Sequence, residues 1–255
     1  MNPAIEDGIC LRRVDYGEAD AIVTFLTRER GKLGCFAKGV KRANSRNAPV
    51  CQLFAVSRLQ LVEGKRLPLL AQSELLDSFY PLREDVWRTA YATFACELCD
   101  RALPDHEPAE AVFELLLTTL HQLAPAGEPE ALIHSFELRL MATLGYQPVL
   151  DHCARCGGGI EEQCAVFCPA AGGLIHAEHH DPREEGVVVT PRVVKALRRL
   201  LQPDEYGLDL LHTHIPPPLA TALREALAAH RRCYLETEPR SVQFLEQLRR
   251  LEPPV

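Results

Sequence analysis

The sequence lacks the features of a membrane, fibrous or disordered protein. No window approaches the ~18 consecutive apolar residues of a membrane-spanning helix. The amino terminus has neither the basic start nor the apolar stretch of a secretory signal. There is no internal repeat and no low-complexity tract, and 47% hydrophobic and 25% charged residues are ordinary globular values. We therefore expect a folded, cytoplasmic protein.

Signatures of common enzyme sites are also missing, since the chain has no P-loop, dinucleotide fingerprint or nucleophile elbow. The segment from His176 to Glu178 shares a motif with zinc deaminases, but its order relative to the cysteines is reversed and the proline before Cys153 is absent. The net charge of −7 excludes a protein that is basic as a whole. Any contact with nucleic acid must therefore come from a local patch.

The ten cysteines fall into two groups. Four of them, from Cys153 to Cys168, lie within 16 positions, and such a cluster favours a metal site over disulfides. The others are scattered among apolar neighbours, which is typical of reduced thiols in a core. These six are Cys10, Cys35, Cys51, Cys96, Cys99 and Cys233.

The first third of the chain has the pattern of short strands. Their length and alternation indicate strands in five apolar runs, over 8–14, 21–27, 33–37, 53–62 and 67–78. Gly31 lies between the second and third runs, where a hairpin needs a positive backbone angle. Five short strands without a long helix predict a small barrel or a strongly bent sheet.

From residue 84 onward the apolar residues recur every three or four positions, which predicts helices. The expected helices cover 86–98, 112–120, 132–144, 191–201, 217–235 and 241–250. Gly145 is a stop signal for the third helix, Thr190 is the expected N-cap of the fourth, and Ser241 that of the last. The cysteine-rich stretch interrupts this helical part.

A basic run lies in the strand-rich part. It contains seven cations, Arg28, Arg30, Lys32, Lys38, Lys41, Arg42 and Arg46, and one acid, Glu29. Residues 1–80 carry a net charge of +3 and residues 81–255 one of −10. A charge run alone is common on a solvated surface, but this contrast in sign favours phosphate contacts from the flexible loop over 38–46.

Three phenylalanines in the same part are candidates for stacking on bases: Phe25, Phe36 and Phe54. They lie at alternating strand positions, where an aromatic side chain is more often core than platform. We expect each of them in the core.

The metal candidate begins with Cys153 and Cys156, which are followed by three glycines as in a zinc knuckle. His176 and His179 have the same spacing and follow a Gly-Gly turn, so we expect them as the second pair of ligands. Residues close enough in sequence to compete are Cys164, Cys168, His152 and His180. Four protein ligands leave no open coordination position, so we expect a structural Zn²⁺.

Several short motifs recur in the order and spacing of a known family. They are Thr24–Thr27 with Gly31 and Lys32, Ala37–Lys41, Gln52–Phe54, Phe136–Tyr146 with Pro148, Cys153–Gly157, Gly172 with Gly173, and Arg240–Ser241 with Phe244 and Leu245. Together they resemble the bacterial RecO family of DNA repair and recombination-mediator proteins over nearly the whole chain. Many members have a second Cys-x2-Cys where this chain has His176 and His179.

The resemblance implies an α+β multidomain fold. It comprises an amino-terminal OB-fold β-barrel over 1–80, a mainly α-helical domain in two parts, 81–150 and 183–255, and a zinc-finger-like insertion over 151–182. It also implies a protein that is not an enzyme and acts in the bacterial cytoplasm at the nucleoid. Such a protein binds single- and double-stranded DNA, anneals complementary strands and, with RecR, helps load RecA onto DNA coated by single-stranded-DNA-binding protein.

The family also engages the acidic carboxy-terminal tail of single-stranded-DNA-binding protein. A pocket for that tail needs an apolar floor and a cation for the terminal carboxylate. We expect one wall of it on the helix that carries Phe136, Arg139 and Leu140.

The main alternative is an acidic, zinc-containing scaffold that binds only other proteins. The net charge of −7 favours this function, whereas the run of seven cations opposes it. Direct binding of DNA separates the two hypotheses.

Overall fold

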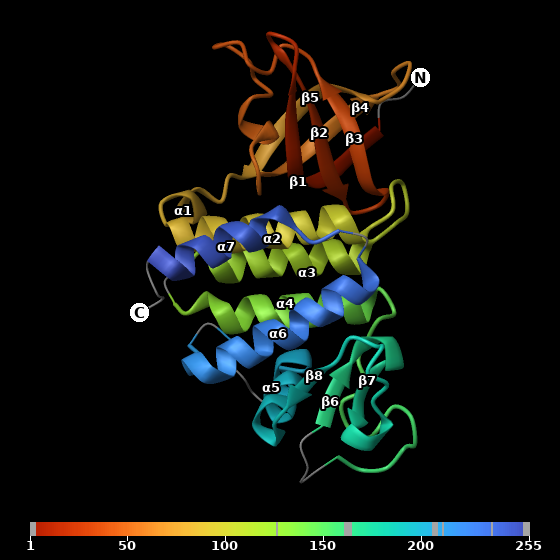
Figure 1. The fold of residues 1–255 in the computed structure, drawn as a ribbon. Helices are drawn as coiled ribbons and strands as arrows, with labels where there is room; N and C mark the ends of the chain where they lie inside the picture. The colour runs from red at the N-terminus through yellow and green to blue at the C-terminus, as the bar shows by residue number, and fades with distance from the viewer. Residues whose placement is uncertain are drawn as a thin grey trace. The chain divides into compact units, whose positions relative to one another are not determined.

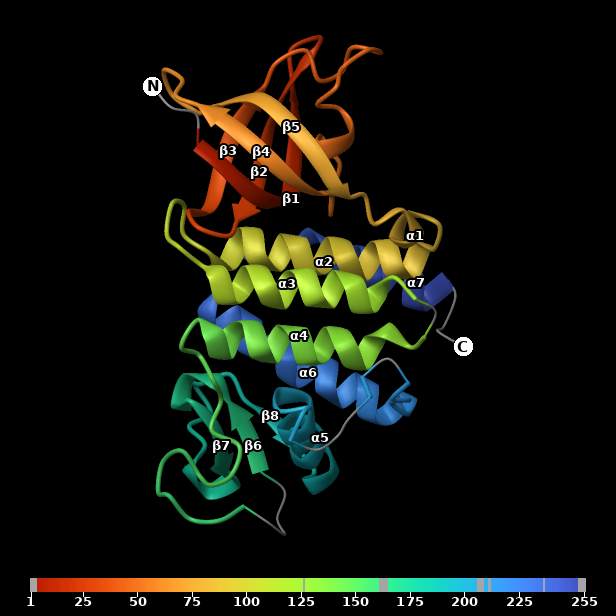
Figure 2. The same cartoon turned by 180° about the vertical axis from the view of Figure 1, so that it is seen from behind.

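The computed structural model describes residues 4–125, 127–160, 165–205, 209–210, 212–235 and 237–251 (Figures 1 and 2). The chain divides by packing into two compact units: Met1–Pro125 together with Pro239–Val255, and Ala126–Glu238. Within the described ranges, no helix combines the length and the apolar character needed to cross a membrane.

The first unit begins with a closed five-stranded barrel in which β1 and β2 pair, β2 and β3 pair, and β4 closes the barrel onto β1. The strands are β1 (Ala4–Tyr16), β2 (Asp20–Thr27), β3 (Gly31–Ala37), β4 (Val56–Val62) and β5 (Leu69–Asp77). The order is β1-β2-β3-β5-β4, with β3 and β5 parallel and all other neighbours antiparallel. Figure 2 shows β4 and β5 on the near side of the barrel. This OB-like barrel confirms the five expected strands.

Alternation along β3 decides which side chains fill the barrel. Leu33, Cys35 and Ala37 are buried in the interior, while Lys32 and Phe36 lie on the outer face. Phe25 of β2 is fully buried in the same interior. Successive residues of a strand point to opposite faces, so the side chains of β3 lie alternately in the barrel core and on the outer face.

A β-bulge changes the alternation of β1. Its pairing with β2 shifts between Cys10 and Arg12, so that one residue of β1 has no partner there. Before the bulge Cys10 belongs to the barrel core, whereas beyond it Val14 and Tyr16 are exposed. The bulge therefore turns the even-numbered residues of β1 from the inside of the barrel to the outside.

The helices of the first unit are α1 (Tyr80–Arg83), α2 (Val86–Ala102), α3 (Glu110–Leu123) and α7 (Arg240–Leu251), which returns from the end of the chain to α2. The carboxylate of Glu97 on α2 accepts the backbone N–H groups of Arg240, at 2.9 Å, and Ser241, at 2.8 Å. The Ser241 hydroxyl donates to the same carboxylate at 2.7 Å. Ser241 was expected as an N-cap, but α7 begins one residue earlier and its hydroxyl is bonded to Glu97.

The second unit combines three helices, α4 (Pro129–Thr143), α5 (Pro191–Leu201) and α6 (Pro217–Tyr234), with a small antiparallel sheet of β6 (Ala165–Cys168), β7 (Gly173–His176) and β8 (Val187–Val189). A buried ion pair joins α4 to α6, since Arg231 donates to Glu137 at 2.6 Å. Two end signals are confirmed. Thr190 accepts from the N–H of Val193, and Gly145 after α4 has a φ of 89°.

The scattered cysteines are free thiols, and five of the six are buried as expected. Burial raises the pKa of Cys35 to about 12 and that of Cys51 to about 11, so these thiols stay protonated at neutral pH. Cys233 was also expected in the core, but it is exposed on α6. The helical period placed Cys233 near the apolar stripe of this helix but did not show where the buried face ends.

Gly31 provides a test of how the barrel is held on the helices. Its φ is +67°, and a Cβ there would lie 1.7 Å from the carbonyl oxygen of Glu107. Gly17 has a similar φ of +61° with nothing within 4 Å of a Cβ. Both Gly→Ala changes incur the cost of a positive φ, about 1 kcal/mol, but Gly31→Ala also forces the backbone apart.

We therefore expect Gly31→Ala to lower the free energy of unfolding of the first unit at least twice as much as Gly17→Ala does. Urea unfolding followed by the fluorescence of Trp87, the single tryptophan, measures both variants. Equal losses would mean that the hairpin is not held against the residues around Glu107.

Candidate metal centre and candidate nucleic-acid interface

Four side chains in the second unit converge on one point: Cys153, Cys156, His176 and His179. Their potential ligand atoms all lie within 4.8 Å of one another. The Sγ of Cys153 lies 3.4 Å from Nδ1 of His179, and the Sγ of Cys156 lies 3.5 Å from Nδ1 of His176. In a tetrahedral zinc site, bonds of ~2.3 Å to sulfur and ~2.0 Å to nitrogen place such atoms about 3.6 Å apart. The residues present therefore fit a tetrahedral metal ion.

The cysteine pair is held by a tight turn. The N–H of Gly157 donates to the carbonyl of Cys153 at 2.8 Å, and the N–H of Cys153 donates to the carbonyl of Gly158 at 2.7 Å. The N–H of Gly158 points at the Sγ of Cys156, 3.4 Å away. Gly157 has a φ of +75°, which is why glycine follows the second cysteine.

The histidine pair is positioned by β7 and the short 3₁₀ turn η3 (Ala177–His179) that follows it. His176 ends β7, opposite Ala165 of β6, and its Nε2 lies 3.0 Å from the carbonyl oxygen of Gly159. A carbonyl only accepts, so this nitrogen carries the proton and Nδ1 is left free for a metal. The strand β7 thus places the ring, and the carbonyl of Gly159 orients it.

The thiol of Cys153 is prepared for metal binding. Burial tends to raise its pKa, but hydrogen bonds with the side chain of His179 and with the backbone of His176, Cys156 and Arg155 lower that pKa to about 6. A thiolate is the form of cysteine that binds a metal, so the cluster presents it near neutral pH.

The competing residues do not join this cluster in the part of the chain that is described. Cys168 is buried in β6 and its Sγ lies 3.4 Å from a carboxylate oxygen of Glu184. His180 bonds through Nε2 with the carbonyl of Glu184, and His152 is exposed. Cys164 lies outside the described residues. Glu178, the deaminase-like glutamate, is exposed.

The seven cations of the basic run do not form one surface. Three of them lie at the β2–β3 hairpin end of the barrel and pair with acids. Arg28 pairs with Glu110 and Glu114 of α3, and Arg30 with Glu6 of β1. Lys32 is mostly buried and donates to the carbonyl of Asp100 at 2.5 Å. These three cations tie the barrel together and to the helices.

The other four lie beyond the opposite end of β3, on the loop over 38–46. Lys38, Arg42 and Arg46 are exposed, and within the described residues none of the three has an ion-pair partner. Lys41 pairs with Asp15 of β1 at 3.1 Å, and this contact, with that of Arg13, lowers the pKa of the Asp15 carboxyl. Three cations therefore remain available to an anionic ligand.

This basic loop, although expected to be flexible, is tied to the turn between β1 and β2. The N–H of Gly39 donates to Oδ1 of Asp20 at 2.7 Å, and the N–H of Lys41 donates to the carbonyl of Ala19 at 2.9 Å. Val40 between them is buried in the barrel core. The loop is therefore anchored at residues that lie between its exposed cations. This anchoring limits the conformational entropy that the loop loses when a ligand binds.

The three phenylalanines separate in the structure. Phe25 and Phe54 are buried, as expected. The expectation for Phe36 was wrong, because it lies half-buried on the outer face of β3 with its ring 5.6 Å from that of Tyr16. Tyr16 was missed from the sequence, since only the bulge in β1 exposes it.

The candidate residues for the partner tail lie on α4. Phe136 and Leu140 are buried and Arg139 is half-buried. The two apolar side chains are thus covered and offer no exposed surface to a peptide. Recognition of the tail by Arg139 stays a prediction.

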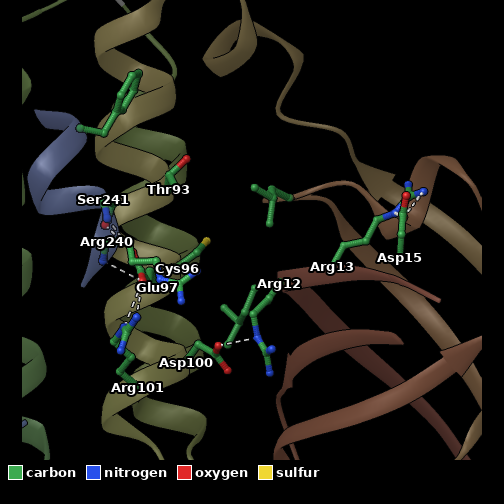
Figure 3. A pocket seen from close by; sticks show the side chains of 13 residues that line it. Arg12, Arg13, Asp15, Thr93, Cys96, Glu97, Asp100, Arg101, Arg240 and Ser241 are labelled. Atoms are coloured by element: carbon green, nitrogen blue, oxygen red, sulfur yellow. Dashed lines mark hydrogen bonds and ion pairs between the residues drawn. The ribbon is translucent and has the colours of Figure 1, made fainter. Parts of the chain in front are cut away.

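A groove of about 1090 Å³ lies within the first unit, between β1 and helices α2 and α7 (Figure 3). Three of its arginines face acids: Arg12 pairs with Asp100 at 2.8 Å, Arg13 with Asp15, and Arg101 with Glu97. Because three of the four arginines that line the groove are already paired with acids, the groove is less suited to a phosphate backbone than the basic loop.

Glu97 in this groove provides a pH test of how α7 is held. Burial tends to raise its pKa, but hydrogen bonds from the backbone of Ser241 and Arg240, the Ser241 hydroxyl and Arg101 lower the pKa below its usual value. A carboxyl whose pKa is lower in the folded state stabilises that state above the unfolded pKa, and the stabilisation is lost as pH falls through the folded pKa.

We expect Glu97→Gln to lower the free energy of unfolding by about 1–2 kcal/mol at pH 7. The difference from wild type should shrink as the pH falls below the ordinary pKa of a glutamate and the Glu97 carboxylate is protonated. Glu246→Gln removes the same charge from an exposed position on α7 and is the control. A Glu97→Gln deficit that stays constant with pH would contradict this role.

Comparison with known proteins places these features in one family. The description "Recombination protein O N terminal" matches residues 1–79 and "Recombination protein O C terminal" matches residues 83–243. DNA repair protein RecO of Symbiobacterium thermophilum is 38% identical over 246 residues, covering 95% of this chain and 96% of that protein. RecO of Heliobacterium modesticaldum is 38% identical over 248 residues (95% and 89%), and that of Bacillus cereus 32% over 242 residues (95% and 96%). With two matching regions across the barrel and the helical part, the chain belongs to the RecO family of DNA repair proteins.

Proposed function

We propose that the protein is a recombination mediator without catalytic activity. It binds single- and double-stranded DNA, anneals complementary strands and, with RecR, helps load RecA onto DNA coated by single-stranded-DNA-binding protein. Membership of the RecO family supports this function. The site of action is the bacterial cytoplasm, at the nucleoid.

The observation that carries the DNA-binding part is the basic loop. Lys38, Arg42 and Arg46 are exposed on a loop that is anchored by Asp20 and Ala19. Cations on an anchored loop contact phosphates of any sequence, because they reach the backbone and not the base edges. Annealing requires this kind of grip, since two strands must search for register while they are held close together.

The Cys₂His₂ cluster serves as a structural zinc site in this proposal. Cys153, Cys156, His176 and His179 would hold the ion and lock the knuckle onto the β6–β7 hairpin. Four protein ligands leave no position for a substrate or an activated water, which agrees with a protein that is not an enzyme. The acidic tail of single-stranded-DNA-binding protein is received near Arg139 of α4.

The basic loop makes a quantitative prediction for DNA binding. We expect Lys38→Gln/Arg42→Gln to weaken binding of a labelled mixed-sequence single strand, measured by fluorescence anisotropy. The slope of log K against log salt should become shallower by about 1.4, which corresponds to two phosphate contacts on a single strand. The loss should be similar for all sequences.

Arg28→Gln/Arg30→Gln is the matched control. It removes the same charge from cations that are already paired with Glu110, Glu114 and Glu6, so we expect a smaller change in the slope. Equal effects of the two double variants would show that total charge matters and not the loop. Wild-type protein that binds no DNA at low salt would favour the alternative, a zinc-containing scaffold that binds only other proteins.

The metal proposal predicts one zinc ion per chain in protein purified without chelator, measured by atomic emission. His176→Ala and His179→Ala should each lower that content and reduce the thermal midpoint by about 5 °C or more, because a structural zinc contributes to folding. His152→Ala, at an exposed histidine outside the cluster, should leave both values unchanged. Full zinc content in His179→Ala would overturn the proposed ligand set.

A further inference from the structure

An apolar row crosses the outer face of the barrel. Val14 of β1 lies opposite Ile22 of β2, Ile22 opposite Phe36 of β3, and Phe36 opposite Leu69 of β5. Val14 is 46% exposed and Leu69 41%, while Ile22 and Phe36 are half-buried. Four strands thus contribute one apolar side chain each to a continuous surface, which is uncommon on the outside of a small barrel.

Two aromatic rings mark this surface. Tyr16, two residues beyond Val14, is 57% exposed, and its ring meets that of Phe36 edge to face, with centroids 5.6 Å apart and an interplanar angle of 78°. An edge-to-face pair leaves a ring face uncovered by its partner. The row and the two rings therefore present π surface to solvent.

The basic loop borders this surface because Lys38 directly follows β3. Two acids near the rings are engaged: Asp15 pairs with Lys41 and Arg13, and Asp20 accepts the N–H of Gly39. The same bond fixes the loop to the strand position opposite Tyr16. Cations without an ion-pair partner among the described residues thus lie beside partly exposed aromatic rings. An unpaired nucleotide matches both features, because its phosphate can contact the cations and its base can stack on the rings.

We propose that Tyr16 and Phe36 form a stacking platform for unpaired bases of a single strand whose phosphates contact the basic loop. The inference rests on the proposed DNA binding and adds a second, base-dependent contribution to it. Duplex bases are stacked on one another and offer no free face, so the platform distinguishes single strands from duplex. It does not distinguish sequences, since every base has a π face.

The experiment compares a mixed-sequence single strand with an abasic strand of the same length, which keeps the phosphates and lacks the bases. Tyr16→Ala should weaken binding of the base-containing strand about fivefold or more and leave the abasic strand and a duplex of equal length unchanged. Tyr16→Phe, which keeps an aromatic ring, should retain binding of the base-containing strand, whereas Tyr16→Leu, which lacks a ring, should not. Tyr80→Ala, at a tyrosine 61% exposed on α1, is the control and should have no effect.

The outcomes separate this inference from the function on which it rests. Wild-type protein that binds both strands equally, or Tyr16→Ala that leaves binding of the base-containing strand unchanged, would overturn the platform while DNA binding by the loop stands. Equal weakening of both strands by Tyr16→Ala would also overturn it, because the effect would then not involve bases. Wild-type protein that binds neither strand would overturn both proposals.

Discussion

The β-bulge in β1 is the constraint on which the proposed DNA-binding surface depends. Up to Cys10 the even-numbered residues of β1 face the barrel interior; beyond the shift in pairing the even-numbered Val14 and Tyr16 face outward. A strand without the bulge would turn Tyr16 inward and expose its neighbours instead, because the side-chain period is two. One unpaired residue therefore creates the surface against which Phe36 packs and beside which the basic loop is held.

Charge pairing divides the cations of the basic run into a structural group and an exposed group. The cations at the β2–β3 hairpin hold the barrel to Glu110, Glu114 and the carbonyl of Asp100. On the loop over 38–46, Lys41 pairs with Asp15, whereas Lys38, Arg42 and Arg46 face solvent. A cation that already has a partner gains little from a phosphate, because the first contact must be broken. Three exposed cations lie on an anchored loop at one end of β3, and structural cations lie at the other end. This acidic protein thus has the local positive charge that the proposed binding of a polyanion requires.

The candidate metal centre is likewise built from few elements. A glycine-containing turn brings Cys153 and Cys156 within reach of His176, which ends β7, and of His179 on the 3₁₀ turn that follows it. The carbonyl of Gly159 fixes the tautomer of one ring, so the ligand set is oriented by backbone groups that also close the knuckle. This arrangement suits a structural ion, which would link the cysteine turn to the small sheet.

The sequence by itself determined the local structure and the chemistry of the ligands. The periods of two and of three to four predicted the five barrel strands and the main helices, and motif spacing selected the four side chains that cluster as a candidate metal site. Tertiary structure alone decided three things: which cations are paired, that Phe36 and Tyr16 share an outer face, and that the Ser241 hydroxyl bonds Glu97. The physical reason is that pairing and exposure depend on residues far apart in the chain, such as Arg30 and Glu6 or Phe36 and Leu69, and on a bulge that local periodicity does not reveal.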